Sequence, residues 1–522
     1  YNVYIGSFAG NRVIKTGNVG VGHRAGMNAT GSANTFIGYE AGEGGTTSAP
    51  FSSGQNNTAI GYQALTGFTT GYNNVMVGNY TGDAITTGES NTALGYAALS
   101  AEDTGTRNVA IGNEALKDLN YDGAGYNVAV GHRAGYALTT QTKTIFIGAF
   151  AGSALTTSGD SNMAIGYAAM GGAEVGDGNI AIGRSSMANA NASGFHRNVA
   201  IGYETMANVG SNSAADNIAI GYQALNDING NALGNVAIGS YSGDAITSGD
   251  YNVSIGENAL SSVNTGGSNI GIGRLAGANN TSANSNMYIG YAAGYGNQTG
   301  TNNTIVGNYS LSQTVGIVNF TNVTTLGWEA GYYATGSYNT FVGSEAGKGG
   351  QTSAPFSSGQ YNVAMGYKAL TAFTTSNNNV AIGREAGYRI TSGGTNVAIG
   401  YQAMSGIVTG GTNVALGYYS LGQVTSGENN IGIGRNALSY NTTADDNIAI
   451  GQYAGERTGQ FRNPTDNIFM GRNAGRYVQG GANLFFGYYA GQGSSANAQS
   501  PGTSNIGLGY QSSVSFISGS YN

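Results

Sequence analysis

One short motif recurs through the whole 522-residue chain, and this recurrence constrains the fold more than any other feature. The motif reads Asn-apolar-Ala-apolar-Gly, as in NVAIG at 396–400. Of the 28 spacings between its 29 occurrences, half are 17 residues and the rest run from 16 to 23. A fixed period of this length is typical of a solenoid. The rungs begin at residues 2, 18, 34, 57, 74, 91, 108, 127, 144, 162, 179, 198, 217, 235, 252, 269, 286, 303, 323, 339, 362, 379, 396, 413, 430, 447, 467, 483 and 505.

Positions 2 to 5 of each rung describe a strand followed by a corner. Position 2 is mostly Val, Ile or Thr, and position 4 is always Ile, Val, Leu, Met or Phe. Because alternate residues of a strand point the same way, positions 2 and 4 share one face. Position 5 is Gly in all 29 rungs, which predicts a corner with positive φ or a close approach of two backbones.

The other repeated positions predict a crowded interior. Position 1 is Asn in all rungs except those beginning at Thr144 and Val323, and we expect these amides to bond from rung to rung as a ladder. Position 8 is always Ala, Ser or Thr, which suits a narrow space where the chain turns back. Position 9 is Gly or a long apolar residue such as Leu65 or Leu438, and only Ser513 departs from this pattern.

These features predict an all-β fold. A helical chain would not tolerate 91 glycines, and the TTG or TSG in many rungs is turn chemistry. We predict a parallel β-solenoid (β-roll or β-helix) of about 29 rungs of mostly 17 residues, with residues 1–522 as one continuous array. At about 4.8 Å per stacked strand, this array would be an elongated rod on the order of 140 Å long.

Composition excludes several classes of protein. Only 9% of residues are charged, and the net charge of −7 forms no basic stripe, so we expect no nucleic-acid partner. No apolar run approaches the roughly 20 residues of a membrane span, and no secretory signal opens the chain. The absence of cysteine excludes a disulfide framework.

Four long rungs hold all four prolines, and proline cannot donate to a sheet ladder. We therefore predict protruding loops at these rungs. Loops on a rigid scaffold commonly carry recognition, so Pro50, Phe51, Pro355 and Phe356 are candidate partner-contact residues. The predicted loops lie near 43–56, 348–361, 456–466 and 492–504.

The chain also contains a long internal duplication. TSAPFSSGQ at 47–55 recurs at 352–360, and the same offset of 305 residues relates six rungs from residue 18 to six rungs from residue 323. The chain opens with YNVYIG and closes with GSYN, so a thirtieth rung would begin at Asn522. Because solenoids need capping repeats, we expect either a window of a longer fibre or other chains covering the ends.

Tyrosine is frequent at position 6, directly after the corner glycine. A stripe of this kind favours a partner surface, and we predict a homotrimer of parallel rods that bury one another's exposed faces. Stacking of the tyrosines on sugar rings is the alternative. The stripe consists of Tyr39, Tyr62, Tyr96, Tyr167, Tyr203, Tyr222, Tyr291, Tyr367, Tyr401, Tyr418, Tyr488 and Tyr510.

The segments NVAIG, NIAIG and NTALG, each followed by a small residue, resemble the head repeats of YadA-type trimeric autotransporter adhesins. They are equally similar to repeats of many phage tail-fibre proteins. The resemblance covers essentially the whole chain and implies a left-handed parallel β-roll, a trimer and attachment at a cell or virion surface. Unlike those adhesins, the chain has longer rungs, no heptad stalk and no membrane-anchor strands, which favours the fibre.

No catalytic constellation stands out. GVGHRAG at 20–26 and GIGRLAG at 271–277 mimic a nucleotide-binding loop, but both are ordinary rung positions. We predict that the neighbouring carboxylates Glu102–Asp103 and Asp445–Asp446 are solvated turn residues. His23 and His132 share position 6 but lie six rungs apart, too far for one metal. We therefore expect no enzyme activity, no cofactor and no metal site.

The sequence favours three functions. The first is a structural shaft of an extracellular or virion fibre, located outside the cell or at a cell or virion surface, that presents an attachment tip. The second is a carbohydrate- or surface-binding adhesin acting along its length, with cell-surface glycans or another fibre protein as partners. The third is an ice-binding solenoid, which needs a regular Thr-x-Thr face that only some rungs provide.

Overall fold

The computed structural model describes residues 1–45, 51–156, 159–172, 174–192, 194–210, 213–313, 318–350, 357–459, 462–493 and 502–513. The chain forms an all-β parallel β-solenoid of about 27 turns of ~17 residues, as the repeat predicts. None of the described residues lies in a helix, so this part of the chain offers no helix that could cross a membrane. The chain divides into two compact units, Tyr1–Gly267 and Ser268–Asn522.

In the first unit, each turn carries a three-residue strand at motif positions 2 to 4. A pair of two-residue strands, β11 and β13, adds a small second parallel sheet. The strands are β1 (Val3–Ile5), β2 (Val19–Val21), β3 (Thr35–Ile37), β4 (Thr58–Ile60), β5 (Val75–Val77), β6 (Thr92–Leu94), β7 (Val109–Ile111), β8 (Val128–Val130), β9 (Ile145–Ile147), β10 (Met163–Ile165), β11 (Glu174–Val175), β12 (Ile180–Ile182), β13 (Asn191–Ala192), β14 (Val199–Ile201), β15 (Ile218–Ile220), β16 (Val236–Ile238) and β17 (Val253–Ile255).

The second unit has the same construction, with its own pair of two-residue strands, β25 and β27. Its strands are β18 (Ile270–Ile272), β19 (Met287–Ile289), β20 (Thr304–Val306), β21 (Thr324–Leu326), β22 (Thr340–Val342), β23 (Val363–Met365), β24 (Val380–Ile382), β25 (Arg389–Ile390), β26 (Val397–Ile399), β27 (Ile407–Val408), β28 (Val414–Leu416), β29 (Ile431–Ile433), β30 (Ile448–Ile450), β31 (Ile468–Met470), β32 (Leu484–Phe486) and β33 (Ile506–Leu508).

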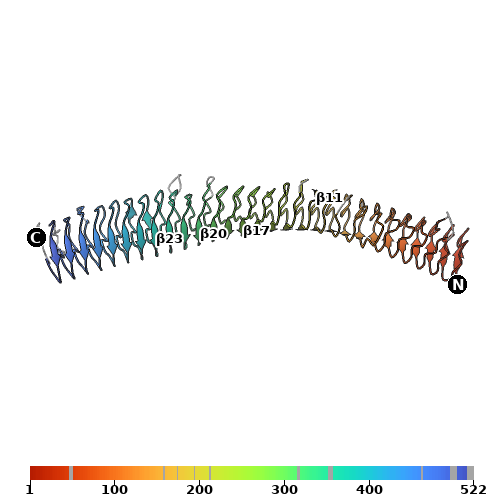
Figure 1. The fold of residues 1–522 in the computed structure, drawn as a ribbon, viewed down its shortest axis with the longest axis horizontal. Helices are drawn as coiled ribbons and strands as arrows, with labels where there is room; N and C mark the ends of the chain where they lie inside the picture. The colour runs from red at the N-terminus through yellow and green to blue at the C-terminus, as the bar shows by residue number, and fades with distance from the viewer. Residues whose placement is uncertain are drawn as a thin grey trace. The chain divides into compact units, whose positions relative to one another are not determined.

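Within each unit the three-residue strands pair in parallel, position for position. In β4 and β5, for example, Ala59 lies opposite Met76 and Ile60 opposite Val77. Figure 1 shows these short strands side by side, one for each turn. The motif therefore fixes the register of the sheet, because each strand starts at the same distance from its corner glycine.

The corner glycine meets both conditions that the sequence predicts for it. At Gly383, φ is +128°, and an added Cβ would lie 2.7 Å from the carbonyl oxygen of Gly400 on the next turn. The same close approach joins Gly366 to Gly383. A side chain fits neither the backbone conformation nor the space.

The interior is built from positions 3, 8 and 9. Phe341 and Ala364, both at position 3, are fully buried, as is Leu370 at position 9. An aromatic residue at position 3 faces a glycine at position 9: a Cβ on Gly347 would lie 2.3 Å from the Phe341 ring. In the next turn the sizes are exchanged, because Ala364 faces Leu370. Positions 2 and 4 point outward, so the strand face that they share is the outer one.

The predicted asparagine ladder is present. The backbone N–H of Asn74 donates to Oδ1 of Asn57 at 2.9 Å, and its Nδ2 donates to the same oxygen at 3.1 Å. The Nδ2 group also donates to the carbonyl oxygen of Gly88, near the end of its own turn, at 2.9 Å. Oδ1 of Asn74 accepts a hydrogen bond from the N–H of Asn91 on the next turn at 2.9 Å, so each amide links three successive turns inside the solenoid.

The ladder is interrupted at Val323, which has no side-chain acceptor. Its N–H donates to Oδ1 of Asn303 at 2.9 Å, but the N–H of Asn339 on the next turn finds no acceptor among the described residues. We expect Val323→Asn to supply that acceptor and to raise the free energy of unfolding by about 1 kcal/mol. Urea unfolding followed by circular dichroism would measure the gain. Val323→Ala is the control, and equal or lower stability of the Asn variant would contradict the expectation.

Candidate functional site

The tyrosines predicted at position 6 all lie on the outside of the solenoid, exposed or half-buried. Those on neighbouring turns stack in pairs. The rings of Tyr39 and Tyr62 lie 5.2 Å apart and 10° from parallel, and those of Tyr203 and Tyr222 lie 5.6 Å apart at 5°. Where stacked, the ring faces contact neighbouring turns, and the edges and hydroxyl groups face outward.

At five turns where position 6 is not aromatic, an arginine stands there instead and lies against neighbouring tyrosine rings, a role that the sequence analysis missed. The Arg184 guanidinium lies 5.9 Å from the centre of the Tyr167 ring and 5.5 Å from that of Tyr203. Arg384 lies in the same way between Tyr367 and Tyr401. We call the stacked position 6 residues the aromatic column. The shared position number of Arg and Tyr was the available signal, since both side chains stack on aromatic rings.

A second surface, the sheet face, consists of the outward side chains at positions 2 and 4. It is apolar along each unit. Leu94 is 47% exposed, Ile382 36% and Leu416 43%. Soluble monomers rarely expose contiguous apolar patches larger than a few hundred Å². The sheet face is therefore a candidate interface.

The predicted Pro-Phe contact loops can be placed only in part. Pro50, Pro355 and Phe356 lie outside the described residues, as do the central residues of the predicted protruding loops. Phe51 is half-buried, with the Arg12 guanidinium 4.4 Å from the centre of its ring. Pro464 does not protrude, because it is buried and its carbonyl oxygen accepts a hydrogen bond from the ladder residue Asn447.

The prediction of solvated carboxylates at Glu102–Asp103 is wrong for Glu102. Its side chain is fully buried, and its Oε1 accepts a hydrogen bond from the N–H of Gly105 at 2.7 Å. Burial raises the pKa of the Glu102 carboxyl to about 7. The tight glycine turn covers the carboxylate, which local polarity in the sequence cannot reveal.

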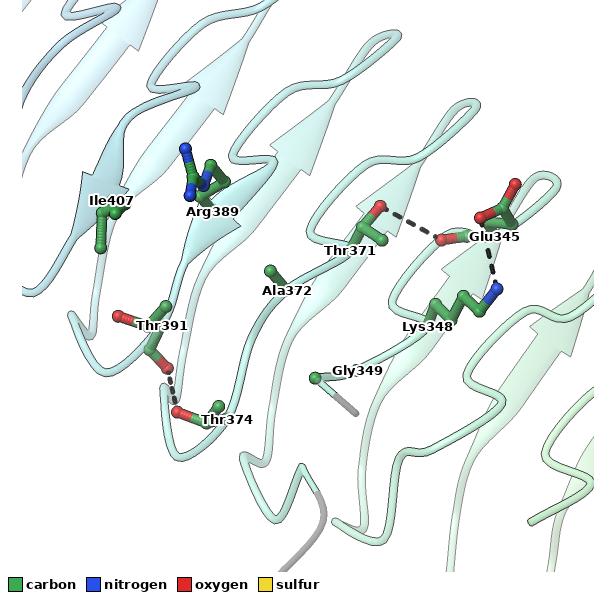
Figure 2. A pocket seen from close by; sticks show the side chains of 10 residues that line it. Glu345, Lys348, Gly349, Thr371, Ala372, Thr374, Arg389, Thr391 and Ile407 are labelled. Carbon is green, nitrogen blue, oxygen red and sulfur yellow. Dashed lines mark hydrogen bonds and ion pairs between the residues drawn. The ribbon is translucent and has the colours of Figure 1, made fainter. Parts of the chain in front are cut away.

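Two adjacent hollows lie on the second unit. The first, of about 400 Å³, runs from Glu345 and Lys348 at one end to Arg389 and Ile407 at the other (Figure 2). Burial lowers the pKa of Lys348, but hydrogen bonds and negative charge from Glu329 and Glu345 outweigh it, so the pKa is raised.

Arg389 also lines the second hollow, of about 480 Å³. Thr371 and Thr374 form the middle of the first hollow, and Thr374 donates to the carbonyl oxygen of Thr391 at 2.9 Å. The second hollow continues over side chains that carry hydroxyl, amide and carboxylate groups. Its lining residues are Lys368, Glu385, Tyr388, Arg389, Gln402, Ser405 and Tyr419.

Comparison with models of known protein families gives no match, and no curated protein matches the chain. The class is therefore defined by the fold alone: the chain is a β-solenoid repeat protein with an apolar sheet face and an external aromatic column.

Proposed function

We propose that this chain forms the structural shaft of an extracellular or virion fibre and spaces an attachment tip away from a surface. The observation that carries this proposal is the apolar sheet face, which repeats on successive turns while the interior is held by the asparagine ladder. Three parallel copies that turn their sheet faces toward a common axis would bury this surface. The resemblance to YadA-type adhesin heads and phage tail-fibre repeats supports the same reading, including a left-handed roll and a location at a cell or virion surface.

Self-association is tested by the mass of the particle in solution. We expect light scattering after size exclusion to give three times the 52.8 kDa chain mass. The triple variant Ile382→Lys, Ile399→Lys, Leu416→Lys should elute as a single chain, because three charges on neighbouring strands would be buried in the interface without partners.

The control places three lysines at the exposed position 14 of the same turns, away from the sheet face: Ser392→Lys, Thr409→Lys and Ser426→Lys. It should keep the wild-type mass. A wild-type protein that runs as one chain at micromolar concentration, or a control that dissociates equally, would refute the proposal.

The second candidate is an adhesin that binds glycans along its length. The aromatic column supplies tyrosine hydroxyl groups for this function. Because stacked rings cover each other's faces, the column offers fewer faces to sugar rings than isolated tyrosines would. A glycan array distinguishes the two, since a shaft should bind nothing along its length.

An ice-binding face receives less support. Several threonine hydroxyls of the turns donate to carbonyl oxygens of the next turn, as Thr425 does to Thr442 at 2.9 Å. The donors of these hydroxyls are therefore engaged within the solenoid.

A further inference from the structure

We propose that the two hollows that share Arg389 bind an acidic saccharide, whose carboxylate is held by the Arg389 guanidinium. The inference requires neither trimer formation nor the function of a shaft, because every residue that it uses lies in one unit of one chain.

The first argument is the charge of Arg389. Its side chain is exposed on β25, and no carboxylate of the described residues lies within ion-pair distance of it. Lys348, at the other end of the first hollow, pairs with Glu329 at 2.5 Å and with Glu345 at 3.4 Å. The Arg389 guanidinium is thus a cation in the lining of both hollows that has no carboxylate partner among the described residues. Its planar fork of N–H donors fits a carboxylate bidentately.

The second argument is the polar lining on either side of that cation. Tyr388 and Tyr419 each present an aromatic ring with a hydroxyl group, which suits a ligand that is apolar on one face and polar at its edges. Gln402 is held in place, because its Nε2 donates to Glu385 at 2.8 Å. Its amide oxygen remains in the lining as an acceptor for a sugar hydroxyl group, and the Ser405 hydroxyl, which donates to the carbonyl oxygen of Gly422 at 3.2 Å, can accept a second hydrogen bond.

The third argument comes from the internal duplication, which supplies a second copy of the same framework. The rings of Phe36 and Phe68 lie 5.5 Å apart in the first copy, and those of Phe341 and Phe373 lie 5.6 Å apart in the second.

The surface hydrogen bonds of the framework also match. Thr66 donates to the carbonyl oxygen of Gln63 at 2.7 Å, and Thr371 donates to that of Lys368 at the same distance. The phenylalanine pairs and these turn hydrogen bonds are therefore kept in both copies, whereas residues 84–85 and 102–103 do not form the short strands that β25 and β27 form in the second copy.

The lining of the hollows, by contrast, is more basic and aromatic in the second copy, although it keeps Glu345 and has Glu385 where the first copy has Tyr80. At an offset of 305 residues, three positions that are acidic in the first copy carry a cation or tyrosine in the second, and two further positions gain a cation. The second-copy residues Lys348, Lys368, Tyr388, Arg389 and Tyr419 stand where the first copy has Glu43, Gln63, Asp83, Ala84 and Glu114. Because the phenylalanine pairs and turn hydrogen bonds are kept, these differences point to a ligand of the second copy that is anionic.

The test uses tetragalacturonate, with its fully methyl-esterified form as the neutral control, in calorimetric titrations of the full chain. We expect the acid to bind about tenfold more tightly than the ester. Arg389→Ala, which installs the residue of the first copy, should lower affinity for the acid about tenfold and leave circular dichroism and thermal unfolding unchanged. Arg384→Asn, the matched control, also installs the first-copy residue, Asn79, but removes a cation of the aromatic column; its affinity should stay within about twofold of wild type.

Four outcomes would overturn the proposal. These are equal affinity for acid and ester, an unchanged affinity of Arg389→Ala, an equal loss in Arg384→Asn, and absence of binding at millimolar acid. A tetraglutamate peptide that binds as tightly as the saccharide would also overturn it, because the site would then recognise carboxylates without the sugar.

Discussion

Gly383→Ala is expected to lower the free energy of unfolding of the second unit by at least about 3 kcal/mol. Two costs combine at this position. The backbone has φ of +128°, and the new Cβ would lie 2.7 Å from the carbonyl oxygen of Gly400. The Gly400 carbonyl group cannot move away, because Gly400 is itself packed against the next turn. A Cβ added to Gly400 would lie 2.6 Å from the carbonyl oxygen of Gly417.

The effect should be local as well as large. Each turn contacts only its neighbours, so a damaged corner weakens adjacent turns before distant ones. Hydrogen exchange should therefore show early loss of protection in β23, β24 and β26, while the first unit keeps its protection. Gly350→Ala is the matched control. Gly350 does not have positive φ and its added Cβ would meet nothing closer than 3.4 Å, so it should cost less than about 1 kcal/mol. Equal losses in the two variants would show that the corner carries no special strain.

The repeat itself predicted the features that each turn shares. A glycine found in every rung has one physical explanation, a backbone that excludes Cβ, and the structure bears this out at Gly383. The ladder followed similarly, because a buried amide repeated at one position can satisfy its neighbours only along the stacking direction, as Asn57 and Asn74 do.

The side of the strand that faces inward could not be predicted from local hydrophobicity. Positions 2 and 4 carry the large β-branched residues and look like core, whereas position 3 is most often Ala. In the structure the small residue is inside, because the solenoid cross-section is narrow and positions 3 and 9 must share it. Ala364 and Leu370 are both fully buried, while Ile382 at position 4 is 36% exposed. Apolar residues that face outward are unexpected for a lone chain.

The two hollows could not be predicted from the sequence either, for a different reason. Arg389 and Tyr419 are two turns apart along the chain, and only the stacking of turns brings them to one surface. The duplication was visible, yet the exchange of Ala84 for Arg389 gains meaning only when both residues are placed on the same framework.

The second prediction with a large expected effect on stability concerns the side chains at positions 3 and 9, where an aromatic residue at position 3 accompanies a glycine at position 9. Phe341→Ala should cost about 3–5 kcal/mol, because the ring is fully buried and its removal leaves a cavity beside Gly347. Gly347→Leu alone should also destabilise, since its Cβ would lie 2.3 Å from that ring. Together they convert this turn into the Ala–Leu form that Ala364 and Leu370 already adopt, with Leu370 at φ +51° where Gly347 has +57°.

We therefore expect the double variant to recover most of the lost stability, with a favourable coupling energy of at least about 3 kcal/mol in urea unfolding. The control is Phe469→Ala combined with Gly347→Leu. Phe469 packs against its own partner Gly475 in a different turn, so these two losses should add. Additive losses in the Phe341 and Gly347 pair would mean that the two positions do not share one volume. The narrow cross-section would then have to be explained by the backbone alone, and the glycine opposite each aromatic residue at position 3 would no longer follow from packing.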